Sequence, residues 1–176
     1  MSADALRLAT EPDLDEILEI VAQAQAYLAK CGVDQWQDGY PNRDVMLDDI
    51  RLCRGYVLQT AGGIVGIATI VFDGEPSYDV IEDGAWTTPV PYACIHRIAV
   101  SAAMRGTGVS ARLMRAAEDV IAAGGVTSVR IDTHRDNRAM QGMLARNGYR
   151  RCGVIYLRNG NERGAARIAL EKTLIR

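Results

Sequence analysis

Several features that mark common classes of protein are missing from this 176-residue chain. No apolar run approaches the roughly 18–20 residues that span a bilayer, so no membrane partner is expected. The first ten residues lack the charged-then-apolar pattern of a secretion signal, which argues against export. Charge is nearly balanced, with 20 Lys and Arg against 22 Asp and Glu, so a nucleic-acid partner is not expected either.

Patterns of metal ligands are equally scarce. The chain has two histidines and four cysteines, and no two cysteines are spaced as CxxC. A structural zinc site is therefore not expected, and no metal is predicted. The cysteines are expected to be small buried hydrophobes with reduced thiols, which together with the missing signal predicts a cytoplasmic protein. They are Cys31, Cys53, Cys94 and Cys152.

What is present is an ordinary globular composition. Apolar residues make up 48% of the chain and charged residues 24%, enough to build a sizeable core. Strands are predicted by β-rich runs at Leu6–Thr10, Tyr56–Thr60, Ile64–Phe72, Ala93–Val100, Val126–Thr133, Tyr149–Leu157 and Ala166–Leu174. Helical periodicity predicts helices between Thr10 and Gly32 and at Asn42–Arg54, Thr107–Ala123 and Arg138–Asn147.

This order of elements predicts an α/β fold in a single domain. The sheet should be mixed and mostly antiparallel, with about six or seven strands flanked by about four helices. The segment 73–91 has three prolines and no periodicity, so it is expected to be a long loop. Loops of this length in a compact domain are usually functional or mobile.

The most informative segment joins an apolar strand to a helix through a glycine-rich turn. The strand Ile95–Val100 is followed by a short loop and then by Arg105-Gly-Thr-Gly-Val-Ser110. Unpaired backbone N–H groups and the positive end of the helix dipole meet at such a turn, and glycine lets an anion approach the chain. The turn therefore predicts an anion site, and it lacks the Gly-Lys-Ser or Gly-Lys-Thr of a Walker phosphate loop.

One interpretation of the turn is a dinucleotide fingerprint. Residues 106–111 match GxGxxA, and Asp132 lies where an acidic ribose ligand would stand, which would make the protein an NAD-dependent oxidoreductase. Against this, Ser101–Arg105 separate the glycines from their strand. About 100 residues precede the motif, and about 65 follow it. A dinucleotide domain should begin with this motif and needs more chain after it.

The second interpretation is a family resemblance. Arg105-x-x-Gly108-x-Ser110 resembles the Arg/Gln-x-x-Gly-x-Gly/Ala motif of the GNAT superfamily of acyl-CoA-dependent N-acetyltransferases. Downstream, the segment from Asn137 to Tyr149 resembles the family's Asn-x-x-Ala-x-x-Leu/Phe-Tyr-x-x-x-Gly-Phe at the same spacing. The order of elements also fits, so the resemblance extends over nearly the whole chain.

The resemblance implies one domain over residues 1–176 with three parts. Acceptor-side elements would occupy 1–91, the acyl-CoA-binding core 92–149 and two final strands 149–176. It implies transfer of an acetyl group from acetyl-CoA, with no metal, to a small-molecule or peptide amine. The residues that it implies for acetyl-CoA are backbone groups of Ile98, Ala99 and Val100, the turn of Arg105, Gly106, Thr107, Gly108, Val109 and Ser110, and the side chains of Asn137 and Arg146.

Acetyl transfer to an ammonium group needs a base, because only the neutral amine is a nucleophile. His96 lies on the strand that leads to the turn and titrates in the right range, so it is the first candidate. His134 and a carboxylate of the 73–91 loop, such as Glu82, are alternatives. Trp36, Glu82 and Trp86 are expected to surround a cationic acceptor, although solvated acids and packed aromatics would look the same in the sequence.

The chain departs from the family pattern at one position. Leu144 stands where the family often has a tyrosine that acts as general acid, and leucine cannot donate a proton. A thiol of pKa near 8–9 is a good leaving group without such help, so activity need not be lost. A catalytically idle acyl-CoA-binding module on the same fold is the alternative. Nothing sets the oligomeric state; a homodimer is expected only because symmetric dimers are the commonest oligomers.

Overall fold

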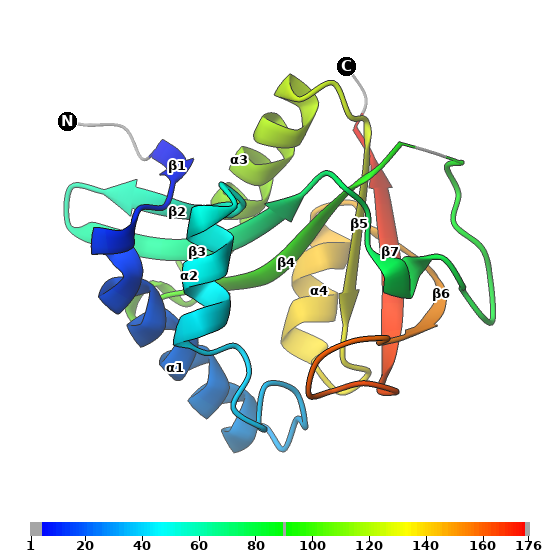
Figure 1. Cartoon of the computed structure of the whole chain (residues 1–176), viewed down its shortest axis with the longest axis horizontal. Coiled ribbons are helices and arrows are strands. Elements are labelled where there is room, and N and C mark those ends of the chain that lie inside the picture. Colours follow the sequence, from blue (N-terminus) through cyan, green and yellow to red (C-terminus); the bar gives the residue numbers. More distant parts are fainter. Residues whose placement is uncertain (1–4, 90, 175–176) are drawn as a thin grey trace. The chain divides into compact units, whose positions relative to one another are not determined.

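A computed structural model describes residues 5–89 and 91–174 of the chain, shown as a ribbon in Figure 1. Within these residues there are four α-helices: α1 (Leu14–Lys30), α2 (Arg43–Arg51), α3 (Val109–Ala123) and α4 (Arg138–Arg146). The seven strands are β1 (Ala5–Leu8), β2 (Gly55–Thr60), β3 (Gly63–Val71), β4 (Ala93–Val100), β5 (Ser128–Thr133), β6 (Arg150–Tyr156) and β7 (Ala166–Thr173). Three short 3-10 helices are η1 (Glu11–Asp13), η2 (Pro76–Tyr78) and η3 (Ala102–Met104).

The sheet is mixed, which confirms the predicted fold class. Its strand order is β1-β2-β3-β4-β5-β7-β6. Strands β4 and β5 run parallel, whereas β1 with β2, β2 with β3, β5 with β7 and β6 with β7 run antiparallel. The chain forms two compact units, one containing residues up to 70 and Arg97–Ala117, the other containing Val71–His96 and the residues from Glu118 onward.

The first unit packs α1 and α2 on one face of β2 and β3. The 3-10 helix η1 leads directly into α1 and begins with a capping box, in which the Thr10 N–H donates to Oδ2 of Asp13 at 2.8 Å. Apolar side chains at helical spacing then meet the alternate residues of the strands. The opposite face is covered by α3, because a Cβ added at Gly66 of β3 would lie 3.0 Å from Leu113. The shared core on the α1 and α2 side contains Leu14, Ile17, Ile20, Val21, Met46, Ile50, Val57, Ile64 and Ile67.

The second unit is built on the first half of β4, with β5, β7 and β6. Its core contains Val71, Tyr78, Cys94, Ile155 and Ala169. The loop 73–92 is part of this core rather than a separate excursion, because Tyr78 is 2% exposed. Glu82 exchanges two backbone hydrogen bonds with Val154 of β6, each 2.8 Å long. The predicted long loop is thus largely ordered by local packing; its residue 90 lies outside the described residues.

Predicted and observed boundaries differ by a few residues. The strand 93–100 has the predicted bounds, whereas the helix predicted from Thr107 begins at Val109. The delay has a backbone cause: Gly106 and Gly108 have φ of 78° and 82°, which an α-helix cannot contain.

The prediction that all four cysteines are buried is wrong for two of them. Cys94 and Cys152 are buried, but Cys31 and Cys53 are exposed. Both exposed residues follow the last turn of a helix, and Cys53 has a φ of 53°, so each belongs to a surface turn. Among the described helices, none is both long and apolar enough to cross a membrane.

Candidate functional site: a glycine turn and the surroundings of His96

The loop between β4 and α3 is held in place from both sides within the first unit. The Ser101 N–H donates to the Val65 carbonyl at 3.0 Å, and the Ala102 N–H donates to Oε1 of Gln23 on α1 at 2.7 Å. A 3-10 turn follows, with the Met104 N–H bonded to the Ser101 carbonyl. These bonds fix the direction in which the chain enters the glycine turn.

The glycine turn presents its backbone to open space. A Cβ added at either Gly106 or Gly108 would meet no atom within 4 Å, and both residues adopt the left-handed conformation that favours glycine. The first helical hydrogen bond of α3 runs from the Arg112 N–H to the Gly108 carbonyl. The amides of residues 109–111 therefore precede the helical ladder, at the positive end of the dipole. This arrangement can bind phosphate.

The side chain of Arg105 is engaged by α1. Its guanidinium carbon lies 4.2 Å from the centre of the Tyr27 ring, and Nη2 donates to the Gln23 carbonyl at 3.3 Å. The residue thus tethers the turn to α1. Its backbone N–H donates to the Ala102 carbonyl at 3.3 Å, so the predicted role of Arg105 in acetyl-CoA binding would require the amide or the guanidinium to share an existing contact.

The end of β4 is half-buried at Ile98, Ala99 and Val100, and Ala99 packs against the core of the first unit.

Just before these residues, Arg97 has a φ of 47°, which breaks the regular alternation of the strand. Its guanidinium pairs with Asp49 of α2 at 2.6 and 2.8 Å and also donates to the Tyr40 hydroxyl at 2.5 Å. Sequence reasoning missed this buried ion pair, and the only hint was a charged residue inside an apolar strand.

His96 lies in a cluster of titratable groups in the second unit. Its Nε2 is 3.6 Å from Oε2 of Glu75, and its ring is 6.1 Å from that of Tyr78. The Tyr78 hydroxyl donates to Oδ2 of Asp132 at 2.7 Å. Burial raises the pKa of Asp132, while the neighbouring His96 opposes that rise. Burial also raises the pKa of the Tyr78 hydroxyl, which keeps it a proton donor at neutral pH.

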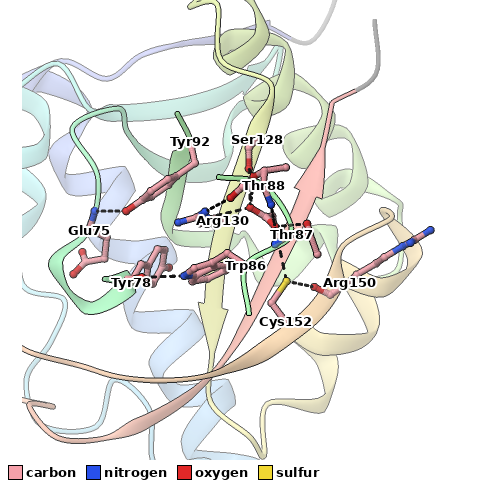
Figure 2. A network of polar contacts seen from close by, with 11 residues as sticks. Glu75, Tyr78, Trp86, Thr87, Thr88, Tyr92, Ser128, Arg130, Arg150 and Cys152 are labelled. Atoms are coloured by element: carbon pink, nitrogen blue, oxygen red, sulfur yellow. Dashed lines mark hydrogen bonds and ion pairs between the residues drawn. The ribbon is translucent and has the colours of Figure 1, made fainter. Parts of the chain in front are cut away.

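A second polar network fastens the loop 73–92 to the sheet, and Figure 2 shows it from close by. Glu171 of β7 lies opposite Arg130 of β5 in the register of the two strands, and Oε1 accepts from Nε of Arg130 at 3.1 Å. The same carboxylate accepts hydrogen bonds from the backbone N–H groups and hydroxyls of Thr87 and Thr88. Burial alone would raise the pKa of Glu171, but these hydrogen bonds outweigh it and lower the pKa to about 2.

Of the residues predicted to surround the acceptor, Trp86 is held in place by contacts within the protein. Its ring lies 4.3 Å from the Arg130 guanidinium, and its indole N–H donates to the Tyr78 carbonyl at 2.9 Å. Trp36 is half-buried in the loop after α1 with a φ of 64°. A bulky residue in this conformation is strained by about 1–3 kcal/mol, and such strain is concentrated at functional sites.

Glu82 is exposed and borders an open pocket of about 490 Å³ in the second unit. The pocket is also lined by Ser77, Val80, Tyr156, Leu157, Arg158, Arg163 and Gly164. Its walls are mixed, with apolar surface from Val80, Tyr156 and Leu157 and charge from Glu82 and the two arginines. A small molecule that carries both charged and apolar parts fits this lining.

Residues in α4 and in the turn between β5 and α4 have clear local roles. Asn137 is the N-cap of α4, and its side-chain oxygen accepts from the Met140 N–H at 3.1 Å. His134 closes the preceding turn by accepting from the Asp136 N–H at Nδ1. Arg146 is exposed in the last turn of α4, and Leu144 is fully buried.

Comparison with known proteins decides the family. The model of the Acetyltransferase (GNAT) family matches residues 17–149. The chain belongs to the GNAT acetyltransferase family. A GNAT-family acetyltransferase from Streptococcus agalactiae is 32% identical with a TM-score of 0.89, over 99% of this chain and 98% of that one. A comparison with curated proteins finds no match.

Two further GNAT-fold structures show how widely the architecture is shared. A GNAT-family acetyltransferase from Listeria monocytogenes is 23% identical with a TM-score of 0.72, over 97% of this chain and 95% of that chain. The structure of yncA from Salmonella typhimurium, solved with its cofactor acetyl-CoA, is 16% identical with a TM-score of 0.69. It covers 99% of this chain and 96% of its own. At these identities the likeness concerns the fold. The protein is thus an enzyme of the GNAT acetyltransferase family.

Proposed function

We propose that this enzyme transfers the acetyl group of acetyl-CoA directly to the amine of a small molecule or a peptide, with His96 as the base. The observation that carries the proposal is the glycine turn at the start of α3, which combines left-handed glycines, open space and amides that precede the helical ladder. In an acetyltransferase of this family, that turn is suited to the pyrophosphate of acetyl-CoA. Acetyl-CoA supplies the activated thioester.

The cofactor residues follow from the same turn. Within the predicted residues 105–110, the amides of Arg105 and Thr107 already donate to the Ala102 and Met104 carbonyls. The amides of Gly106 and of residues 108–110 would therefore hold the pyrophosphate, and the absence of any Cβ at Gly106 and Gly108 leaves room for it. Backbone groups of Ile98, Ala99 and Val100 would pair with the pantetheine. Asn137 would add a contact alongside its capping role, and the exposed Arg146 would meet the nucleotide end. The yncA structure with acetyl-CoA supports this cofactor in the shared fold.

The base must take a proton from an ammonium group whose ordinary pKa is near 10. His96 suits this task, because imidazole is neutral over much of the physiological range and accepts a proton directly or through water. Its alternatives are weaker: His134 is engaged by the turn before α4, and the Glu82 carboxylate is exposed. These observations support His96, rather than His134 or Glu82, as the proposed base.

The acceptor is expected to be a cationic amine. Glu82 offers a carboxylate in the pocket of the second unit, and the strained Trp36 offers an aromatic surface in the first. Trp86 would contribute through the packing of the loop that carries Glu82. The mixed lining of the pocket favours an acceptor that also carries an anionic group, because Arg158 and Arg163 line it too.

Leu144 is buried and cannot donate a proton, so no tyrosine at that position protonates the departing CoA thiolate. A thiolate with an ordinary pKa near 8–9 takes its proton from water, so we expect turnover. A catalytically idle acyl-CoA-binding module is the second candidate, and Leu144 is the observation that favours it. A cytoplasmic location and a homodimer remain predictions.

The test is an acceptor screen with the full chain and acetyl-CoA. Release of free CoA is followed with amines, aminoglycosides, polyamines and peptide N-termini, and the acetylated product is identified by mass spectrometry. Mass spectrometry is needed because the exposed Cys31 and Cys53 react with thiol reagents and raise the background. Acetyl-CoA binding by calorimetry with no acetylated product from any acceptor would favour the idle module. Thermal stabilisation by NAD, and not by acetyl-CoA, would overturn both.

A further inference from the structure

The carboxylate of Glu75 lies beside the imidazole of His96 and is held in place by a second contact. Oε2 of Glu75 lies 3.6 Å from Nε2 of His96, and the side chains are 25% and 16% exposed. The other oxygen, Oε1, accepts from the Ser77 N–H at 3.0 Å and so caps η2. One oxygen is thus committed to the backbone, and the second is directed to the imidazole.

The backbone of Glu75 is fastened as well. Its N–H donates to the Tyr92 hydroxyl at 3.3 Å, and the Tyr92 ring lies 3.9 Å from the Arg130 guanidinium. Arg130 is in turn held by Glu171, whose Oε1 accepts from Nε of Arg130 at 3.1 Å. The buried network on the sheet therefore ends at the residue that faces His96. A side chain anchored at both ends is preorganised, and it needs little ordering when it acts.

The other titratable groups near His96 in this unit are already engaged or neutral. Asp132 also interacts electrostatically with His96, but its carboxylate accepts a hydrogen bond from Tyr78 at 2.7 Å and lies 4.0 Å from Arg167. Burial raises the pKa of the Cys94 thiol, which keeps it uncharged. Glu75 is therefore the carboxylate that directly opposes the imidazole nitrogen.

We propose that Glu75 is the positioning residue of His96, which orients the imidazole and stabilises its protonated form. This inference rests on the proposed role of His96 as the base. A carboxylate at this distance favours the charged imidazolium, so the His96 pKa should be about one unit higher with Glu75 than without it. A more basic imidazole takes a proton from an ammonium group more readily.

The test measures the His96 pKa directly by NMR. The chain has only two histidines, so the two ring signals are assigned by comparison with His134→Gln. Glu75→Gln keeps an oxygen for the Ser77 cap and removes the charge. Asp79→Asn is the matched control, because Asp79 lies on the same turn but pairs with Arg158 at the surface.

We expect the His96 pKa to fall by about one unit in Glu75→Gln and to stay unchanged in Asp79→Asn. The acidic limb of the kcat/KM profile should move to lower pH by the same amount. Glu75→Asp keeps the negative charge, so the fall in the His96 pKa should be at most half of that seen in Glu75→Gln. Thermal unfolding confirms that each variant is folded.

Two results would overturn the inference: a His96 pKa that is the same in Glu75→Gln as in the wild type, or one that falls equally in Asp79→Asn. Failure of the proposed base looks different. In that case the NMR shift is present, but His96→Ala keeps the wild-type acidic limb and kcat.

Discussion

Arg130 and Glu171 form a buried ion pair across β5 and β7, with Nε and Oε1 3.1 Å apart and both side chains 5% exposed or less. The pair joins two strands to the loop 73–92, because Glu171 also binds Thr87 and Thr88 while the Arg130 Nη2 donates to the Thr88 carbonyl. The loop is thus held by charge-assisted bonds, which are stronger than neutral ones.

Glu171→Gln should destabilise the protein by about 3 kcal/mol at neutral pH, as expected for the loss of one partner of a buried pair. The folded-state pKa of Glu171, about 2, lies below its ordinary value of 4.5. The stabilisation is therefore present above about pH 4.5 and is lost as the pH falls toward 2.

Chemical denaturation at several pH values checks this prediction. The difference in the free energy of unfolding between wild type and Glu171→Gln should shrink through that window. Asp79→Asn, which loses only an exposed ion pair, should differ from the wild type by about 1 kcal/mol or less. A constant difference down to pH 2 would contradict the assignment.

Gly108→Val should weaken acetyl-CoA binding, because a branched side chain would fill the space beside the amides of the turn. The left-handed φ adds strain, so the variant needs a control with the same strain. Gly125 is suited to this, with a φ of 81° and no atom within 4 Å of an added Cβ. Calorimetry should show lower affinity for Gly108→Val and wild-type affinity for Gly125→Val. Equal acetyl-CoA affinities in the two variants would contradict the proposal that the pyrophosphate binds at this turn.

His96→Ala should lower kcat by at least about tenfold, since general-base assistance is worth ~10²–10⁴-fold and water replaces it in part. The acidic limb of the kcat/KM profile should flatten or move, because it follows the titration of the base. Acetyl-CoA affinity should change little, because its expected contacts are mostly to the backbone. His134→Ala is the control and should keep the limb. If His96→Ala kept nearly the full kcat, the general base would have to be His134 or a carboxylate of the loop.

Glu82→Gln should raise the KM for a cationic acceptor by up to about fivefold, the value of an exposed ion pair of 0.2–1 kcal/mol. Acetyl-CoA affinity should stay the same. Asp83→Asn removes the neighbouring charge, which does not line the pocket, and should leave both constants unchanged. Trp36→Ala should act as Glu82→Gln does. Parallel losses for both substrates would indicate a folding defect.

The sequence by itself determined most helices and strands and the glycine turn before α3. The bounds of β4 and the start of α4 at Arg138 agree with prediction, because they depend on local patterns of apolar residues. The glycine turn was also visible, since it occupies six consecutive residues. Local propensity and short spacings decide such features without reference to the rest of the chain.

Only the tertiary structure decided which distant side chains meet. Arg130 and Glu171 are 41 residues apart, and the register of β5 with β7 places them opposite each other. Glu75 and His96 meet because the loop between them folds onto the sheet and η2 turns the carboxylate toward the strand. Such contacts depend on strand pairing and loop packing, which are cooperative properties of the whole fold, and no spacing in the sequence records them.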